Sequence, residues 1–271
     1  MEKTFNFRLY STDLFGQIWT PKTVKAVVVL VHGMGEHSSR YKESVVPHLV
    51  SHDFAVIGFD LFGHGKTKGK RGHCPSYNAL MDVIEYVIEK SMILFPDKAT
   101  YLYGHSLGGN LAINYVLRRN NTIKGVVASS PFLKLAFQPP KWKVAIGKLL
   151  LRTFPSITLS SEIDESAISR DPVEVKRYHD DKLIHDKISP MFSFPVMGAG
   201  QWAISNAGKF ETPILLLHGT GDRLVDHKGS VEFCEKAKHA QLKLYENGFH
   251  ELHHDLCKEE FINDILYWLE N

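Results

Sequence analysis

Cysteine is scarce in this chain, and an apolar run long enough to cross a membrane is missing. Among 271 residues the only cysteines are Cys74, Cys234 and Cys257, and no two of them have a C-x-x-C spacing. An odd number without that spacing argues against a disulfide framework and for a reducing compartment. No run approaches the roughly 18 apolar residues of a membrane-spanning helix, and residues 1–10 lack the apolar stretch of a signal peptide. We therefore expect a cytoplasmic protein.

An excess of charge of one sign is absent as well. The 32 basic and 30 acidic side chains leave a net charge of +2, and this balance predicts no nucleic-acid partner. Hydrophobic residues make up 44% of the chain, an ordinary value for a globular protein. Because no internal repeat or low-complexity tract interrupts the sequence, we predict one domain spanning residues 1–271.

Apolar strands alternate with amphipathic helices over most of the chain. Ala26–Val31 is apolar throughout, as expected of a strand buried on both faces of a parallel sheet. Further strands are predicted at residues 54–59, 99–103, 125–129, 214–217 and 242–245, with helices between them at 41–51, 77–95, 230–238 and 258–269. After an opening β-hairpin at residues 5–19, this alternation predicts an α/β fold with a doubly wound, mostly parallel sheet flanked by helices.

The alternation stops at Pro131 and resumes at Pro213. Residues 133–209 are helical in pattern, punctuated by proline, and contain no convincing strand. We interpret them as an inserted helical cap over the C-terminal edge of the sheet, where open α/β folds bind ligands.

Residues 142–154 of this insertion have a basic amphipathic pattern. Apolar residues recur at helical spacing at Trp142, Ala145, Ile146, Leu149 and Leu150, whereas Lys141, Lys148 and Arg152 fall towards another face. Such a helix can make peripheral contact with an anionic membrane. A helix that covers an apolar pocket has the same pattern, so both interpretations stay open.

The pentapeptide Gly104-His105-Ser106-Leu107-Gly108 follows the predicted strand at 99–103. A G-x-S-x-G sequence between a strand and a helix is the nucleophile elbow of an α/β-hydrolase. Its sharp turn strains the serine backbone, and glycines two residues on either side remove side chains that would clash. The pattern predicts Ser106 as a nucleophile at the C-terminal edge of the sheet.

A serine nucleophile needs a histidine base and an acid that orients it, which follow in the order Ser, Asp or Glu, His in this fold. Asp222 lies in the loop after strand 214–217, and His250 lies after strand 242–245. Asp226 is a rival acid, but Asp222 is closer to the strand end. His253 and His254 are rival bases, although we expect them in the first turn of the last helix. The predicted triad is Ser106, Asp222 and His250.

Two backbone N–H groups are expected to form the oxyanion hole. One belongs to Leu107, the residue after the nucleophile, and the other comes from an earlier strand-end loop. The segment His32-Gly33-Met34-Gly35 follows the first buried strand, and we assign the second N–H to Met34. Because backbone groups donate these hydrogen bonds, the Met34 side chain is predicted to tolerate substitution.

The segment His250-Glu251-Leu252-His253-His254 also satisfies H-E-x-x-H, the zinc-peptidase pattern. That chemistry requires both histidines on one face of a helix and a third protein ligand, whereas His250 follows a strand and a turn. We interpret this match as coincidental and predict no metal and no organic cofactor. A hydrolase fold retained only for binding is a further alternative, but such proteins usually lack a triad member.

Several segments resemble the monoacylglycerol lipases, within the serine hydrolase group that also holds bacterial lysophospholipases. The resemblance covers nearly the whole chain and is most specific at residues 32–41, 60–65, 104–109, 221–225 and 245–251. It implies a serine carboxylester hydrolase that cleaves monoacylglycerols to fatty acid and glycerol. Lysophospholipase and broad-specificity carboxylesterase activities remain alternatives, since the loop bearing Lys66, Lys68, Lys70 and Arg71 could attract a phospholipid head group.

The resemblance also implies substrate-binding residues. Glu36, Arg40 and His105 would arrange the polar end of the pocket around a glycerol head group, with Tyr178 joining from the cap. Glu36 and Arg40 could instead form a local ion pair that stiffens the oxyanion loop, and we weigh the two interpretations equally. The cysteines of the acyl channel in mammalian members have no counterpart here, because His185 and Phe192 occupy that region.

Overall fold

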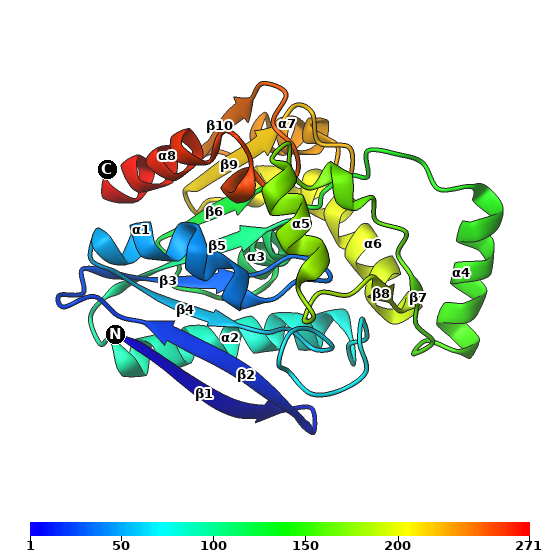
Figure 1. Cartoon of the computed structure of the whole chain (residues 1–271), viewed down its shortest axis with the longest axis horizontal. Helices are drawn as coiled ribbons and strands as arrows, with labels where there is room; N and C mark the ends of the chain where they lie inside the picture. The colour runs from blue at the N-terminus through cyan, green and yellow to red at the C-terminus, as the bar shows by residue number, and fades with distance from the viewer.

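The computed structural model describes all residues 1–271 and contains one eight-stranded sheet at its centre (Figure 1). The strand order is β1-β2-β4-β3-β5-β6-β9-β10. The bounds are β1 Glu2–Leu9, β2 Thr12–Trp19, β3 Ala26–Val31, β4 Phe54–Phe59, β5 Ala99–His105, β6 Gly125–Ser129, β9 Ile214–Gly219 and β10 Ala240–Tyr245. Strands β1, β2 and β4 pair antiparallel, and every pair from β4 to β10 is parallel. The predicted mostly parallel sheet is thereby confirmed.

Helices cover both faces of this sheet, and successive strand residues face opposite helical layers. On one face lie α1 Val45–Ser51 and α8 Lys258–Glu270; on the other lie α2 Tyr77–Leu94, α3 Leu107–Arg118 and α7 His227–Cys234. Val28 and Leu30 of β3 pack in the cluster with α1 and α8, whereas Val27 and Val29 pack in the larger cluster with α2 and α3. A strand buried on both faces therefore has to be apolar at every position.

The segment between β6 and β9 contains three α-helices and two short strands. These are α4 Lys141–Thr153, β7 Leu159–Ser160, α5 Pro172–Asp180, β8 Lys187–Ile188 and α6 Pro190–Asn206. Strands β7 and β8 form a two-stranded antiparallel sheet. We expected no convincing strand here, and a pair of two-residue strands is too short to leave an alternating pattern in the sequence.

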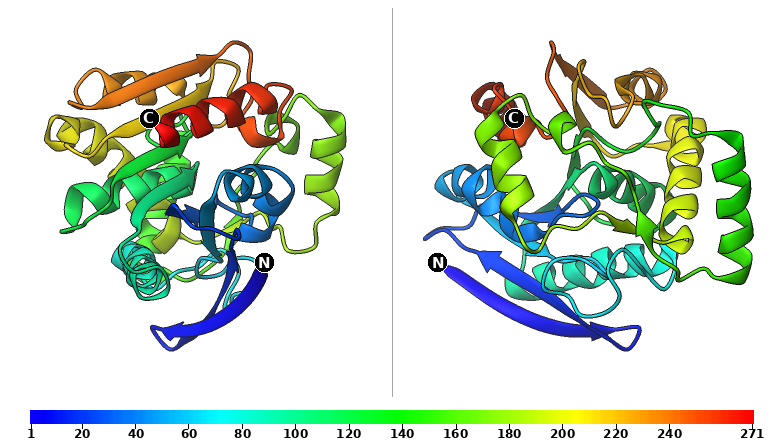
Figure 2. Two further views of the ribbon diagram at one scale, coloured as in Figure 1. Left: turned by 90° about the vertical axis from the view of Figure 1, so that its left-hand side faces the viewer. Right: turned by 45° about the vertical axis from the view of Figure 1, so that its right-hand side comes forward.

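Helix α6 packs into the main body of the protein rather than standing above it. Its Phe192, Val196, Ala203 and Ile204 are buried in the larger core cluster beside α3. Helix α4 differs, because it buries none of its residues and packs mainly against α6. Figures 1 and 2 show α4 at the periphery of the molecule, joined by extended segments at both ends.

Loops at the C-terminal edge of the sheet hold the middle of the inserted segment. The His185 N–H donates to the Gly35 carbonyl at 2.9 Å, and the Ser189 N–H donates to the Gly72 carbonyl at 2.8 Å. His37 Nε2 lies 2.9 Å from Asp181 Oδ2. These contacts fasten the end of α5 and strand β8 to the edge where β3 and β4 end. None of the helices combines the length and the apolar character needed to cross a membrane.

Candidate active site

The chain turns sharply between β5 and α3, and Ser106 occupies that turn with φ 52° and ψ −111°. Positive φ is costly for a residue with a side chain, and the neighbouring glycines make it sterically accessible. A Cβ at Gly104 would overlap the Gly108 carbonyl, and one at Gly108 would overlap the Val31 carbonyl. The Ser106 N–H donates to the Ser129 carbonyl at 2.9 Å, which fastens the turn to β6.

Asp222 and His250, from the loops after β9 and β10, are hydrogen-bonded through His250 Nδ1 and Asp222 Oδ2 at 2.7 Å. The other carboxylate oxygen of Asp222 accepts the N–H groups of Leu224 and Val225 at 2.8 and 3.0 Å. Asp226, the rival acid, instead accepts the Lys228 N–H at the start of α7. The structure therefore brings Asp222, and not Asp226, to His250.

Both groups of this pair have shifted pKa values. Burial alone would raise the pKa of Asp222, but the neighbouring His250 and hydrogen bonds from His218 and His250 hold it below its ordinary value. Burial would lower the pKa of His250, yet the charge and hydrogen bond of Asp222 more than offset it and leave the pKa raised. The ionised carboxylate thus favours a proton on Nδ1 and leaves Nε2 available as a base.

His250 lies close to the serine turn. Its backbone carbonyl accepts the Ser130 hydroxyl at 2.8 Å at the end of β6, and its ring centroid is 4.8 Å from that of His105, the residue before Ser106. No hydrogen bond joins the Ser106 hydroxyl to His250 in this structure. Nucleophile and base commonly reach bonding distance only in the complex with substrate, so their direct contact stays a prediction.

The Gly33–Met34 peptide faces the same turn. A Cβ built at Gly33 would lie 3.3 Å from Ser106 Cβ. His32 Nε2 accepts the Leu61 N–H at 3.0 Å, so its proton resides on Nδ1, which donates to the Gly33 carbonyl at 2.7 Å. Because a trans peptide directs its C=O and N–H in opposite directions, this bond also orients the N–H of Met34.

The N–H groups of Met34 and Leu107 have no acceptor within the protein. Leu107 is the first residue of α3, where the helix dipole adds a partial positive charge. The Met34 side chain points elsewhere, with Sδ 3.3 Å from His64 Nε2. Two N–H donors without an acceptor thus lie in the segments expected to form the oxyanion hole, and their role there stays a prediction.

Glu36 and Arg40 belong to a buried network behind the Gly33 loop. Glu36 Oε1 accepts the Gly33 N–H and the Tyr41 hydroxyl, and Oε2 pairs with Arg40 Nη1 at 2.9 Å. Arg40 also forms a two-pronged pair with Glu251, at 2.6 and 2.9 Å. Their side chains are almost fully buried. The contacts match the interpretation of an ion pair that stiffens the loop, whereas substrate contact by Glu36 and Arg40 stays a prediction.

His105 and Tyr178, the other predicted binding residues, lie beside this network. His105 Nδ1 is 3.4 Å from Ser129 Oγ, and burial together with the nearby His250 lowers the pKa of His105 to about 4. It is therefore neutral at physiological pH. The Arg40 guanidinium lies 4.9 Å above the Tyr178 ring, and no protein group binds the Tyr178 hydroxyl. Contact of that hydroxyl with substrate stays a prediction.

A family model described as "Serine aminopeptidase, S33" matches residues 22–257. The chain belongs to this serine hydrolase family. Monoglyceride lipase of Homo sapiens is 34% identical over 260 residues, which cover 94% of this chain and 84% of that protein. The crystal structure of Paleococcus ferrophilus monoacylglycerol lipase has a TM-score of 0.87 and 38% identity, covering 94% of this chain and 98% of that one.

These similarities confirm the α/β-hydrolase fold and identify the chain as a carboxylester hydrolase. An uncharacterized abhydrolase domain-containing protein of Dictyostelium discoideum is 37% identical over 93% of this chain. That relative is longer, and the chain spans only 27% of its length.

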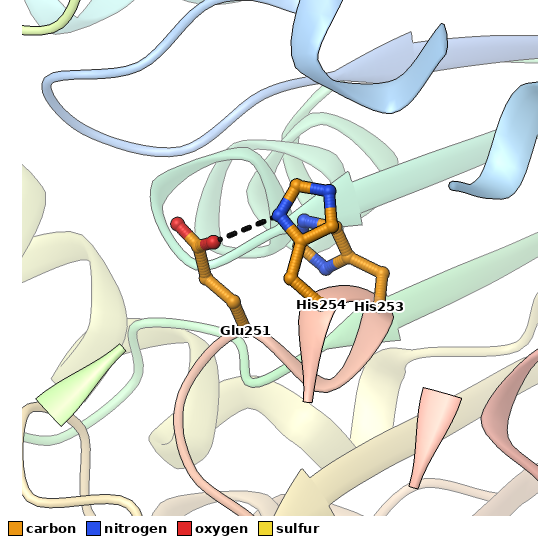
Figure 3. A group of neighbouring side chains, drawn as sticks. All are labelled: Glu251, His253 and His254. Atoms are coloured by element: carbon orange, nitrogen blue, oxygen red, sulfur yellow. Dashed lines mark hydrogen bonds and ion pairs between the residues drawn. The ribbon is translucent and has the colours of Figure 1, made fainter. Parts of the chain in front are cut away.

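Glu251, His253 and His254, which follow His250 in the chain, form a cluster (Figure 3), with His254 Nδ1 3.1 Å from Glu251 Oε2. Both oxygens of Glu251 already bind the Arg40 guanidinium, whose Nη2 also lies 3.1 Å from His254 Nδ1. A metal ion at this place would have to displace a buried cation. The Arg40 guanidinium therefore already occupies the position beside Glu251 and His254, whereas the ring nitrogens of His253 have no hydrogen-bond partner.

Our expectation for His253 and His254 was wrong in position. Both lie in a short 3-10 helix, Leu252–His254, that precedes α8 instead of forming its first turn. Sequence reasoning also missed Glu251 as a partner of Arg40, because the two residues are 211 positions apart. It missed the role of His32 too, which the position of that residue directly before Gly33 could have suggested.

Proposed function

We propose that this chain hydrolyses monoacylglycerols through a Ser106–His250–Asp222 triad and an acyl-enzyme. The observation that carries the proposal is the 2.7 Å hydrogen bond between His250 and Asp222, formed beside a strained serine turn. The similarity to monoglyceride lipases supports the choice of substrate. Residues 133–209 serve in this proposal as the cap of a single hydrolase domain.

In the first half of the reaction, Ser106 Oγ attacks the acyl carbonyl carbon and His250 Nε2 takes its proton. The N–H groups of Met34 and Leu107 bind the resulting oxyanion. The bond to glycerol then breaks, and the glycerol oxygen receives the proton from His250. In the second half, water attacks the acyl carbon and gives a proton to His250, which returns it to Ser106 as the fatty acid leaves. Asp222 stabilises the imidazolium in both halves.

An uncharged head group suits the charges behind the oxyanion loop. Two carboxylates, Glu36 and Glu251, enclose one guanidinium, Arg40, so the network has an excess of negative charge. A phosphate brought to this end would meet that negative charge. The free hydroxyl of Tyr178 can instead bind a glycerol hydroxyl. These features favour glycerol esters over lysophospholipids.

Helix α4 is the element that we expect to make peripheral contact with the membrane holding such substrates. Its exposed apolar side chains include Trp142, Ile146 and Leu149, which are 62%, 50% and 60% exposed. Lys141, Lys148 and Arg152 accompany them on the helix. An exposed apolar stripe flanked by basic residues is typical of helices that lie at an anionic lipid surface.

The test combines one variant with a substrate panel. Wild type and Ser106→Ala are assayed on monoacylglycerols, lysophospholipids and nitrophenyl esters, and both are treated with a fluorophosphonate probe. We expect labelling and turnover in the wild type alone, with monoacylglycerols giving the highest kcat/KM. Retained esterase activity in a folded Ser106→Ala would overturn the triad, whereas a preference for lysophospholipids would overturn the substrate.

A further inference from the structure

Asp222 is bound by a second buried histidine besides His250. His218, near the end of β9, places Nε2 3.2 Å from Asp222 Oδ2, the same oxygen that His250 contacts. The His218 side chain is fully buried. Its other ring nitrogen, Nδ1, lies 2.8 Å from the hydroxyl of Ser230 in α7. Both nitrogens are therefore used, although His218 touches neither the serine turn nor the oxyanion loop.

The neighbours of His218 determine where its proton resides. Nε2 also lies 3.3 Å from the Val225 carbonyl, which can only accept a hydrogen bond. Nε2 must then carry the hydrogen, and it donates to Asp222 Oδ2 and to Val225. Ser230 is buried, and its hydroxyl donates to Nδ1 when the ring is neutral. The contacts thus make Nε2 a donor aimed at the acid of the triad.

We propose that His218 is a positioning residue that limits how strongly Asp222 attracts the proton of His250. The hydrogen bond from His218 partly neutralises the negative charge on Oδ2 of Asp222. The carboxylate therefore stabilises the imidazolium of His250 less strongly. His218 thereby keeps His250 deprotonated at a lower pH than Asp222 alone would allow. This inference rests on the triad proposed above and adds to it a residue that acts through the acid.

We expect Asp222 to keep its position when His218 is replaced. An effect on the charge that His250 experiences can then be separated from an effect on the position of the carboxylate. Asp222 Oδ1 keeps its hydrogen bonds to the N–H groups of Leu224 and Val225. Removal of the Nε2 donor therefore changes the charge felt by His250 more than the position of the carboxylate. We expect a rise in the pKa of His250 and a shift of the acidic limb of kcat/KM to higher pH.

Other titratable groups face this assembly. His250 is surrounded by Asp222, His105, Glu251 and Glu36, and His218 by Asp222 and by His227, whose ring centroid is 6.3 Å away. His105 titrates near pH 4 and stays neutral where His250 titrates. The two glutamates stay paired with Arg40 when His218 or His227 is replaced, because neither histidine contacts that network. The acidic limb can therefore be assigned to His250.

The test measures kcat/KM against pH with nitrophenyl butyrate, a soluble ester that does not depend on the cap or the head group. In His218→Leu, which removes the donor, we expect the acidic limb to move upward by about half a pH unit. His218→Gln, whose side-chain amide can still donate, should keep the wild-type limb. His227→Leu is the matched control, since His227 has no contact with Asp222, and it should leave the limb unmoved.

A merely structural role for His218 predicts lower stability and an unmoved limb in His218→Leu, and that result would overturn the inference. Ring-nitrogen NMR of His218 in the wild type keeps the inference testable if the Leu variant fails to fold. A hydrogen on Nε2 is expected in the neutral ring, and the Nδ1–H tautomer would contradict it. If wild-type protein neither cleaves the ester nor reacts with a fluorophosphonate, the proposed triad is wrong. That result differs from both outcomes of the His218 experiment.

Discussion

The Glu36 carboxylate pairs with the Arg40 guanidinium at 2.9 Å inside the protein, and one oxygen of the same carboxylate binds the N–H of Gly33. Arg40 thus connects the Gly33 loop to the loop after β10, because it also pairs with Glu251. Burial would raise the pKa values of Glu36 and Glu251, but Arg40 holds both below the ordinary range. The network is ionised, and its charges depend on one another.

Arg40→Leu should destabilise the fold strongly. The variant leaves Glu36 and Glu251 buried without a cation, and breaking a buried ion pair from one side costs about 3 to 5 kcal/mol. Arg177→Leu is the matched control, because Arg177 is 58% exposed in its pair with Glu174 and exposed pairs contribute at most about 1 kcal/mol. Urea denaturation of both variants measures the difference. Equal losses of unfolding free energy would contradict the structural role of Arg40.

His32→Phe should lower kcat by about 10²- to 10³-fold, the loss expected when one oxyanion donor is misplaced. The ring of His32 holds the Gly33 carbonyl and thereby the direction of the Met34 N–H. Met34→Leu serves as the control, since its backbone N–H is retained, and we expect kcat within a few-fold of wild type. Steady-state kinetics on a soluble ester compare the two. A Met34→Leu loss as large as that of His32→Phe would contradict the assignment of the backbone donor.

Asp222→Asn should lower kcat strongly, whereas Asp226→Asn should have little effect. Loss of the Asp222 charge removes the stabilisation of the His250 imidazolium and is expected to lower kcat by about 10⁴-fold. Asp226→Asn keeps a side-chain oxygen at the start of α7 and should change neither kcat nor stability by much, because Asn also caps helices well. Kinetics together with thermal unfolding check both. Substantial activity in Asp222→Asn would show that another group orients His250.

The sequence patterns predict the fold well because its strands leave local signals. Val27 to Val31 are apolar at every position because helices cover both faces of β3, and the spacing of Gly104 and Gly108 around Ser106 reflects the overlap that any Cβ would cause. These signals lie within a few residues of one another. A prediction from one sequence can therefore find the elements and the elbow without knowing how they pack.

Partners that are distant in the chain leave no such signal. Arg40 and Glu251 are 211 residues apart, and no pattern around either one identifies the other. His218 and Asp222 show a different limit: they are only 4 positions apart, but their spacing does not reveal which way the loop after β9 turns. The packing of helix α6 into the main core could not be predicted for a related reason. Its apolar residues indicate burial but not the surface against which they are buried.

His253→Phe should make the protein less sensitive to acid. Burial, together with His254 and His105, holds the pKa of His253 well below its ordinary value. Between about pH 6.5 and that lower value only the unfolded chain binds the proton, so unfolding free energy falls as pH falls, by about 1.4 kcal/mol per pH unit for one histidine. Without the histidine this contribution disappears.

Urea titrations of wild type and His253→Phe at several pH values from 7.5 down to 4.5 measure this difference. At pH 7.5 neither state of His253 binds the proton, so the offset there reports packing alone. The slope of unfolding free energy against pH should be shallower in the variant by about one proton. Identical slopes would show that His253 takes up its proton equally in both states.

Replacement of Trp142 and Leu149 by serine should weaken binding to anionic phospholipid vesicles by about tenfold or more, since each exposed apolar side chain buried in lipid contributes about 1.5 to 3 kcal/mol. Ile93→Ser on α2 is the control, because Ile93 is 79% exposed but lies on a different helix. Vesicle co-sedimentation measures binding, and activity on a soluble ester should stay unchanged in every variant.

Lys148→Glu should weaken binding further at low salt and lose its effect at high salt, because screening removes the attraction between basic side chains and anionic lipid. Equal binding of wild type and the Trp142/Leu149 double variant would mean that these side chains of α4 do not contact lipid, and would favour the other interpretation, a helix that covers an apolar pocket.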